Sequence, residues 1–161
     1  MKNILIPCET YHKISDISLE YLFNDLQIKG LIFDFDGTLL LKNQISAETL
    51  EFLKKAKEMG FKISVLSNNI HVSNTILKTI NINTTKKLAF KPRKKPFYDM
   101  AKRMKLPTEK IAVIGNNKLS DILGANRAGM YSIYIQNNLN NILNRIKTKN
   151  KLKNIGIKHI D

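Results

Sequence analysis

The chain has 161 residues, 43% of them hydrophobic and 25% charged, a composition typical of a globular domain, which we expect to span 1–161. Its 27 Lys and Arg residues against 13 Asp and Glu residues give a net charge of +14, which suits nucleic acid, an anionic membrane or a phosphorylated substrate but equally matches a lysine-rich genome. One cysteine, Cys8, excludes an intramolecular disulfide framework, and the lack of a signal peptide or of an apolar stretch of about 18 residues favours a cytoplasmic protein, soluble or peripheral at a membrane.

Strand-like and helix-like patterns alternate along the chain, which predicts an α/β fold with a three-layer, doubly wound parallel sheet. We expect residues 1–14 to be irregular and to lie along an edge of the fold. Short apolar runs predict core strands at about 31–35, 61–66, 87–90, 111–114 and 131–135. Helical spacing and capping residues predict helices at about 16–28, 47–59, 71–80, 95–105 and 119–127.

The expected core covers about 29–136, preceded by the helix at about 16–28 and followed by a basic tail at about 137–161. Several apolar residues should face this core from the first two helices, namely Ile17, Leu22, Leu26, Leu50, Leu53 and Ala56. In the tail, Ile142, Leu143 and Ile146 permit a terminal helix, and no structure is predicted beyond about Lys147.

The most informative stretch is the apolar run that begins at Leu31 and is interrupted by Asp34 and Asp36. A buried strand has no structural use for two carboxylates, because burying unpaired charge costs several kcal/mol. Open α/β sheets bind ligands at the carboxyl ends of their strands. We therefore expect these aspartates to open into a site in which a metal ion holds their charge.

Polar residues also follow the other predicted core strands, and together they suggest phosphoryl transfer. Asp34 offers a nucleophilic carboxylate, and Asp36 can act as general acid and then as general base. Lys91 can stabilise negative charge in the transition state, while Ser67 and nearby backbone amides can donate to phosphoryl oxygens. Asp121, with Asp34, offers oxygen ligands for Mg²⁺.

This ordered set resembles the four motifs of the haloacid dehalogenase-like (HAD) phosphohydrolase superfamily over roughly residues 31–135. The matching segments are Asp34-Phe35-Asp36-Gly37-Thr38, Ser67, Lys91-Pro92, and the run from Gly115 and Asn116 to Asp121. The resemblance implies Asp34 and Asp36 as catalytic residues and Mg²⁺ as the cofactor. Implied phosphate-binding residues are Thr38, Ser67, Asn68 and Lys91, and implied metal ligands are Asp34, Asp36, Asp121 and Asn116.

Further segments resemble the YqeG-like branch of subclass IIIA, which is related to phosphatidylglycerophosphate phosphatases. They are Pro7 with Ile17, Ser67-Asn68-Asn69, and the run from Asp121 to Met130. The resemblance implies an Mg²⁺-dependent phosphomonoester hydrolase that forms an aspartyl-phosphate and acts on a lipid-borne phosphate such as phosphatidylglycerophosphate.

Two positions depart from the branch pattern. Gly37 stands where the branch has Asn, which we regard as harmless, and Asn116 stands where the fourth motif has its first Asp. A pair of unit charges at about 4 Å and an effective dielectric near 20 is worth about 4 kcal/mol. Because desolvation offsets part of this, we expect Mg²⁺ affinity to fall by about tenfold to a thousandfold. Asn116 therefore leaves open a catalytically impaired binding module.

Some assignments depend on neighbouring residues. Lys91 is favoured over Lys95 as the site lysine because proline follows it, and the other basic residues of that run should be surface charge. Asn126 and Arg127 are favoured for loop packing over substrate contact. The three histidines share no metal-ligand spacing.

No cap domain fits between Thr38 and the second core strand, where only a loop and one helix are expected. The site should therefore be open, roofed only by the loop near Leu40–Ile45, and suited to a phosphate on a large body. An anionic membrane is the favoured platform, because each basic residue near it contributes about 1 kcal/mol. A nucleic-acid end phosphatase is the alternative, although aromatic residues are only 7% and are not interleaved with the basic runs. No obligate protein partner is inferred.

Overall fold

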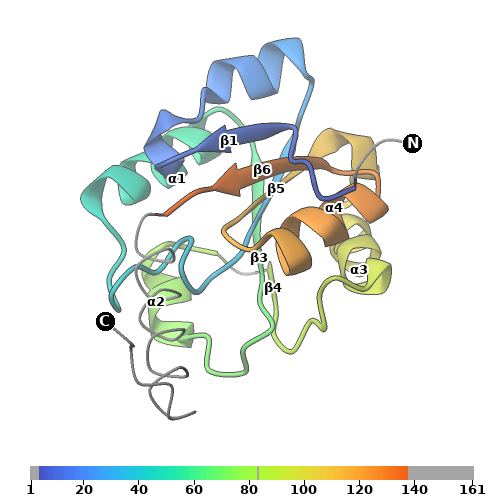
Figure 1. The fold of residues 1–161 in the computed structure, drawn as a ribbon. Helices are drawn as coiled ribbons and strands as arrows, with labels where there is room; N and C mark the ends of the chain where they lie inside the picture. The colour runs from blue at the N-terminus through green and yellow to red at the C-terminus, as the bar shows by residue number, and fades with distance from the viewer. Residues whose placement is uncertain (1–3, 83, 138–161) are drawn as a thin grey trace, which may run out of the picture.

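The computed structural model describes residues 4–82 and 84–137, which contain a six-stranded, all-parallel sheet (Figure 1). The strands are β1 Glu9–Tyr11, β2 Gly30–Phe33, β3 Lys62–Leu66, β4 Thr84–Lys86, β5 Ile111–Gly115 and β6 Tyr131–Ile135. Their spatial order is β1-β6-β5-β2-β3-β4. The expected parallel α/β sheet is therefore confirmed.

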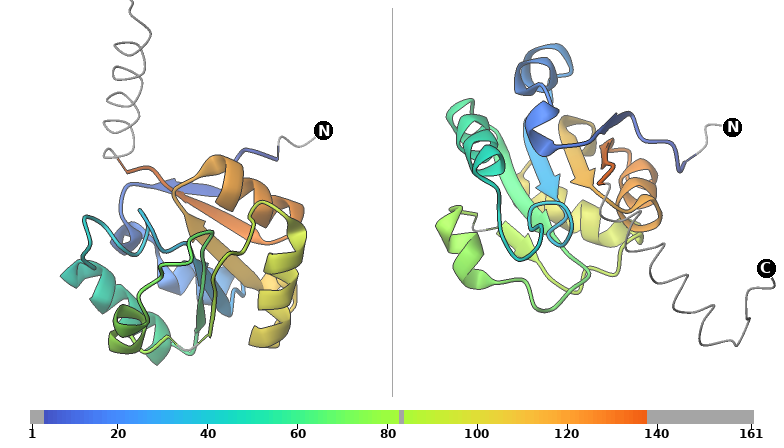
Figure 2. Two further views of the ribbon diagram at one scale, coloured as in Figure 1. Left: turned by 90° about the horizontal axis from the view of Figure 1, so that it is seen from below. Right: turned by 60° about the vertical axis from the view of Figure 1, so that its left-hand side comes forward.

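Helices cover both faces of this sheet (Figure 2). The α-helices are α1 Ala47–Glu58, α2 Asn74–Thr79, α3 Lys94–Met104 and α4 Leu123–Arg127. Shorter turns are η1 Ile14–Asp16, η2 Tyr21–Asp25, η3 Thr108–Lys110 and η4 Lys118–Ile122. With α1 and α2 on one face and α3 and α4 on the other, the predicted three-layer architecture is confirmed.

Two hydrophobic clusters hold the layers together, and β2 contributes to both. Leu31 and Phe33 join the cluster that contains residues of α1, where the Phe33 and Phe52 ring centroids lie 6.4 Å apart. Ile32 joins the other cluster, which contains Phe97 of α3. Successive side chains of a strand point to opposite faces, so a strand buried on both faces is apolar throughout.

The sheet has a switch point between β2 and β5. The chain runs from β2 to β3 and β4 on one side, then returns to β5 on the other side of β2. Phe33 of β2 consequently lies in register with Val65 of β3 and Ile114 of β5. The loops that follow β2 and β5 diverge here, and this is where parallel sheets bind ligands.

The connections near this edge are short. Between Thr38 and β3 lie one loop and α1, and between β3 and β4 lie one loop and α2. Within the described residues there is accordingly no inserted cap domain over the carboxyl ends of the strands. None of the helices in the described part of the chain has the length and apolar character needed to span a bilayer.

The third core strand was wrongly predicted at 87–90. The strand is Thr84–Lys86, in register with Ser64 to Leu66, and residues 87–90 form a bend and a loop in which Leu88 and Phe90 have φ angles of 47° and 55°. The apolar character of Leu88 and Phe90 suggested burial, but both side chains are exposed. The actual strand uses β-branched threonines, which suit extended backbone.

The N-terminal region also differs from its prediction. Residues 1–14 were expected to lie irregularly at an edge, and the edge position is confirmed, but Glu9–Tyr11 form a strand that pairs with β6. The single helix expected at 16–28 is wrong, because Ile17 is extended between η1 and η2. The Ser18 hydroxyl accepts from the Tyr21 amide, so a new helical turn starts there.

The remaining helices match their predictions with shifted ends. Ser46 caps α1 by accepting from the Thr49 amide at 3.1 Å. The helix predicted at 71–80 is shorter, since Ser73 caps it and it covers Asn74–Thr79. The possible helix around Ile142 lies outside the described residues.

Leu50 of α1 was predicted to be buried but is exposed. Leu50 and Leu53 are therefore two leucines on one helix that differ in burial. Leu53 is 2% exposed and Leu50 is 41% exposed. We expect Leu53→Ala to lower the free energy of unfolding by about 2–5 kcal/mol, because it leaves a cavity in the core. Leu50→Ala should change it by no more than about 0.5 kcal/mol. Urea denaturation measures both, and equal losses would contradict this packing of α1.

Candidate active site

The candidate site is a cleft of about 630 Å³ at the carboxyl ends of the parallel strands. Residues from the loops after β2, β3, β4 and β5 line it, together with one residue of β6. They are Asp34, Asp36, Ser67, Asn68, Asn69, Lys91, Asn116, Asn117, Lys118, Leu119, Ser120, Asp121 and Tyr134. The predicted site residues therefore meet in one cleft, except Thr38, which lies directly behind Asp34.

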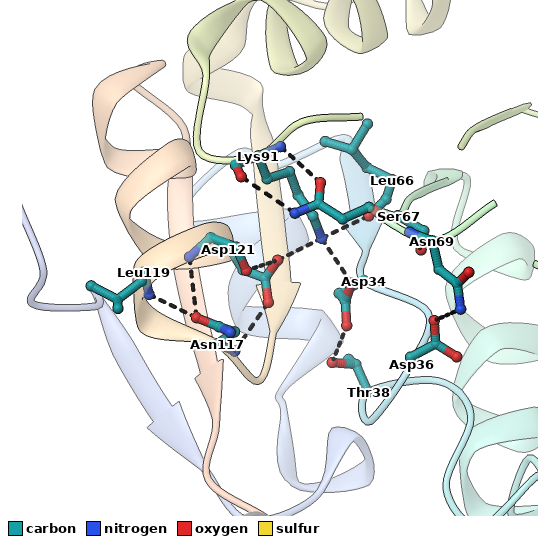
Figure 3. Close-up of polar contacts among 12 residues, drawn as sticks. Asp34, Asp36, Thr38, Leu66, Ser67, Asn69, Lys91, Asn117, Leu119 and Asp121 are labelled. Atoms are coloured by element: carbon teal, nitrogen blue, oxygen red, sulfur yellow. Dashed lines mark hydrogen bonds and ion pairs between the residues drawn. The ribbon is translucent and has the colours of Figure 1, made fainter. Parts of the chain in front are cut away.

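Lys91 lies at the centre of this cleft (Figure 3). Its Nζ donates to Asp34 Oδ1 at 2.7 Å, to Asp121 Oδ1 at 2.6 Å and to the Leu66 carbonyl at 2.9 Å. The Lys91 side chain is only 3% exposed, whereas that of Lys95 is 82% exposed. All three ammonium hydrogens are used, so the lysine bridges two carboxylates that come from different loops.

The charges in this cluster shift one another's pKa values. Burial opposes the charge of Lys91, but the Asp121 and Asp34 carboxylates outweigh burial and raise the pKa of Lys91 above its ordinary value. Burial and, next, the Asp121 charge raise the pKa of Asp34 from 3.8 to about 6, against the opposing effect of Lys91. With two carboxylates to one ammonium, the ionised cluster has a negative charge that favours a cation.

Asn68 positions the lysine. Its side-chain Oδ1 accepts from the Lys91 amide at 2.8 Å, and its Nδ2 donates to the Lys91 carbonyl at 3.3 Å. The sequence favoured the backbone near Asn68, over its side chain, as a donor to phosphate, and the side chain contacts the backbone of Lys91 in the loop after β4. Sequence reasoning missed this contact, because the two residues belong to separate loops with α2 and β4 between them.

The loop after β5 holds Asp121 through several contacts. The Asn117 amide donates to Asp121 Oδ2 at 3.0 Å, and the Ser120 hydroxyl donates to its Oδ1 at 3.3 Å. The Asn117 side chain caps η4 by accepting from the Leu119 and Ser120 amides. A Cβ at Gly115 would lie 2.4 Å from atoms of Asp121, so only glycine leaves room for this carboxylate.

Asp34 follows β2 directly, and its own amide donates to the Ile114 carbonyl at 2.9 Å. Its second carboxylate oxygen, Oδ2, accepts from the Thr38 hydroxyl at 3.3 Å, and Thr38 is buried. A tight turn brings Thr38 back to Asp34, closed by a bond from the Gly37 amide to the Leu40 carbonyl. The positive φ of Gly37, 80°, suits glycine in this turn.

Asp36 lies at the exposed edge of the cleft, apart from Lys91. Its Oδ2 accepts from Asn69 Nδ2 at 3.1 Å. The Asn69 amide in turn donates to the buried Ser67 hydroxyl at 3.0 Å. For Asn69 the sequence favoured backbone donation to phosphate over a side-chain role, and the structure shows that its side chain holds the second aspartate of the first motif.

The two positions that depart from the branch pattern lie against each other. A Cβ built at Gly37 would lie 2.2 Å from Asn116 Nδ2. In this conformation a side chain at position 37 would therefore collide with the Asn116 amide. Asn137 also contacts this turn, because its Nδ2 donates to the Gly37 carbonyl. The Gly37 and Asn116 substitutions are thus spatially linked, which their separation in sequence did not suggest.

The donor set fits a hard divalent cation. Among the described residues, no group of three or more His, Cys, Asp or Glu side chains is arranged to hold a metal. Mg²⁺, however, is usually bound by one or two carboxylates together with water and substrate phosphate. Asp34, Asp121 and the Asn116 amide line the same cleft and offer such oxygens.

Asn126 has a structural role, as favoured from the sequence. Its Nδ2 donates to the carbonyls of Ile4 and Ile6, at 2.8 and 2.9 Å, and its Oδ1 accepts from the Ser132 hydroxyl at 2.7 Å. These bonds fasten the segment before β1 to α4 and β6. Asn126 is not among the residues that line the cleft.

Comparison with known proteins agrees with this architecture. The haloacid dehalogenase-like hydrolase family model matches residues 41–129. The probable phosphatase YqeG of Bacillus subtilis is 32% identical over 138 residues, which cover 84% of this chain and 79% of that protein. The chain belongs to the haloacid dehalogenase-like hydrolase family and is one of its phosphatases.

Solved structures share the fold. An uncharacterized protein from Listeria monocytogenes superposes with a TM-score of 0.58 at 25% identity, covering 68% of this chain and 79% of that chain. A protein assigned to subfamily III A of the HAD hydrolases, from Legionella pneumophila, has a TM-score of 0.51 at 20% identity and covers 60% of this chain and 59% of its own. These similarities concern the arrangement of strands and helices.

Removing the central ammonium tests the charge balance of the cluster. Lys91→Met leaves two buried carboxylates without their counter-ion, and we expect a loss of about 3–5 kcal/mol in the free energy of unfolding at pH 8. The loss should shrink at pH 5. Without Lys91 the pKa of Asp34 in the folded protein rises above about 6 while the unfolded value stays near 3.8, so acid neutralises the folded site first.

The control is Lys95→Met, which removes an exposed ammonium paired with Asp99 at 3.3 Å. This substitution should cost less than about 1 kcal/mol at either pH, because exposed ion pairs contribute little. Urea denaturation at pH 5 and pH 8 measures both variants. An equal loss for the two variants, or a loss from Lys91→Met that grows at pH 5, would contradict the buried charge cluster.

Proposed function

We propose that this chain hydrolyses phosphate monoesters with the help of Mg²⁺, through a phosphoryl group carried transiently on Asp34. The observation that carries the proposal is the buried Asp34–Lys91–Asp121 cluster at the base of an open cleft. Lys91 holds Asp34 Oδ1, while Oδ2 has only the Thr38 hydroxyl as a partner among the described residues. One oxygen of the nucleophile is thus fixed and the other is available for attack.

In the first step, Asp34 Oδ2 forms a bond to phosphorus as the bond to the leaving oxygen breaks. Asp36 gives its proton to that oxygen, which leaves as an alcohol. The Lys91 ammonium and the Ser67 hydroxyl stabilise the charge that moves onto the phosphoryl oxygens, with Thr38 and the backbone near Asn68 as further donors.

In the second step, Asp36 takes a proton from a water molecule that attacks phosphorus. The bond to Asp34 breaks, inorganic phosphate leaves, and both aspartates return to their starting states. The exposed position of Asp36, held by Asn69 at 3.1 Å, suits a group that exchanges protons with both the leaving oxygen and water.

The residues that would hold Mg²⁺ are Asp34, Asp36, Asp121 and Asn116. When bound, the ion supplies positive charge that neutralises and orients the phosphate. Lys91 occupies one oxygen of each buried carboxylate, so the ion and the lysine would share the charge of Asp34 and Asp121. Asn116 contributes a neutral amide oxygen where the family has a carboxylate, which lowers the affinity for the ion.

The substrate that we propose is a lipid-borne phosphate monoester such as phosphatidylglycerophosphate, presented at an anionic membrane to which the protein binds peripherally. The resemblance to the YqeG-like branch supports this choice. Two further observations agree with it: the described residues include no cap domain over the cleft, and the net charge is +14. An open cleft accepts a phosphate that remains attached to a large body.

The nucleophile is tested by Asp34→Asn, assayed as release of inorganic phosphate with and without Mg²⁺. We expect the Mg²⁺-dependent rate to fall by more than about a thousandfold, because the amide cannot form the acyl-phosphate. Asp99→Asn removes a carboxylate from a surface ion pair with Lys86 and should retain the wild-type rate. Equal rates for Asp34→Asn and wild type would contradict the proposal, as would the absence of turnover by the wild type at high Mg²⁺.

Asn116 favours a second candidate function, a binding module that holds a phosphate without turning it over. For an active enzyme we expect Asn116→Asp to lower the Mg²⁺ concentration at half-maximal rate by about tenfold to a thousandfold. The control is Asn117→Asp, which adds the same charge one residue along in the same cleft and should have a smaller effect. Activity that appears only in Asn116→Asp, from a silent wild type, would establish the binding module instead.

The choice of substrate distinguishes a lipid phosphatase from a nucleic-acid end phosphatase. Parallel assays compare phosphatidylglycerophosphate in vesicles with an oligonucleotide that carries a 3′-phosphate. We expect faster turnover on the vesicles, and faster turnover on the oligonucleotide would identify an end phosphatase.

A further inference from the structure

Four exposed apolar side chains lie on segments that contribute to the lining of the cleft, namely the loops after β3 and β4 and the turn η4. Ile70, Leu88, Phe90 and Leu119 are 53%, 44%, 63% and 65% exposed. We call these four residues the apolar rim. Single exposed apolar residues are common on proteins, but several on the segments that line one cleft suggest an interaction surface.

The rim residues are tied closely to the site. Leu119 lines the cleft itself, Phe90 directly precedes Lys91, and Ile70 directly follows Asn69. The loops of residues 67–73 and 87–93 run beside each other, joined by a hydrogen bond of 3.0 Å from the Ala89 amide to the Ser67 carbonyl (Figure 1). Leu119 therefore belongs to the lining of the cleft, Phe90 and Ile70 each adjoin a lining residue in sequence, and Leu88 lies on the same loop as Phe90.

The backbone holds two of these side chains outward. Leu88 and Phe90 both have positive φ angles, 47° and 55°, which bulky residues rarely adopt. Between them Ala89 is buried, and after them the Lys91 amide is fixed by Asn68. The fold thus imposes an unfavourable conformation that leaves two large apolar side chains in solvent. Such strain often accompanies binding sites.

The segments around the cleft carry more basic than acidic residues. The loops of residues 34–46, 67–73, 87–93 and 116–121 include four basic residues besides Lys91, namely Lys42, Lys87, Arg93 and Lys118. The acidic residues of these loops all line the cleft: Asp34, Asp36 and Asp121. The Arg93 guanidinium lies 5.7 Å from the centre of the Phe90 ring, so one of the four basic residues is adjacent to the apolar rim.

We propose that the apolar rim inserts into the boundary between headgroups and acyl chains of an anionic bilayer, with the cleft facing the membrane. The four basic residues would then lie against lipid phosphates. This inference rests on the proposed function, because the docked protein would receive a lipid phosphate monoester at Asp34. The rim itself is a property of the surface and can be tested without turnover.

The composition of the rim favours a bilayer over nucleic acid. Three of its four members, Ile70, Leu88 and Leu119, are aliphatic and offer no ring on which a base could stack. Aliphatic side chains flanked by basic residues are typical of surfaces that lie at a membrane interface.

The test measures sedimentation of the full chain with vesicles of phosphatidylcholine alone and of phosphatidylcholine with phosphatidylglycerol. We expect binding to the anionic vesicles, and a loss of at least about tenfold in the double variant Leu88→Asn/Phe90→Asn, because two apolar side chains are removed from the interface. Asparagine adopts positive φ more readily than other residues, so the loop keeps its backbone conformation.

The matched control is Leu50→Asn/Tyr98→Asn, which removes two apolar side chains that are 41% and 44% exposed on α1 and α3. It should bind vesicles like the wild type. Wild-type binding by the rim variant overturns the proposal, and so does binding of the wild type to a single-stranded oligonucleotide but not to anionic vesicles.

Parallel turnover of para-nitrophenyl phosphate separates this inference from the proposed function. If the protein hydrolyses no monoester but binds vesicles through the rim, membrane docking by the rim is supported and the phosphatase mechanism is refuted. If the protein hydrolyses para-nitrophenyl phosphate but does not bind anionic vesicles, the phosphatase mechanism is supported and membrane docking by the rim is refuted.

Discussion

The structure of the cleft depends on one interaction, the contact of the Lys91 ammonium with two buried carboxylates. A buried ion has lost its hydration, and it is tolerated only when its partners are close and its remaining hydrogen bonds are satisfied. Lys91 meets this condition through Asp34, Asp121 and the Leu66 carbonyl, all within 2.9 Å. The three side chains come from three different loops, so the cluster also ties together the loops that follow β2, β4 and β5.

Several neighbouring residues are explained by this requirement. Gly115 leaves the space that the Asp121 carboxylate occupies, and Asn117 donates to its second oxygen. The Asn68 side chain holds the Lys91 backbone by accepting from its amide and donating to its carbonyl. These contacts maintain a carboxylate whose pKa is raised to about 6 by burial and by Asp121. The arrangement keeps Asp34 ionised near neutral pH but poorly solvated, as a nucleophilic carboxylate requires.

The outer part of the site is exposed to solvent, unlike the buried charge cluster. Asp36 is exposed, and the exposed rim residues are apolar and lie on segments that also carry basic residues, so the proposed proton exchange and surface contact would take place where water is available. Gly37 and Asn116 lie against each other. A change at one of these positions therefore restricts the other, which links the two departures from the branch pattern to a single local packing.

The sequence by itself determined the parallel α/β fold and the strand ends that bear polar residues. These features follow from local patterns, since an apolar run long enough for a strand and a capping serine such as Ser46 act within a few residues. Only the tertiary structure decided that Glu9–Tyr11 form an edge strand, that Leu88 and Phe90 lie outside the sheet, and which side chain each asparagine contacts. The physical reason is that these features depend on strand order and register, which bring loops together across distances that no local periodicity records.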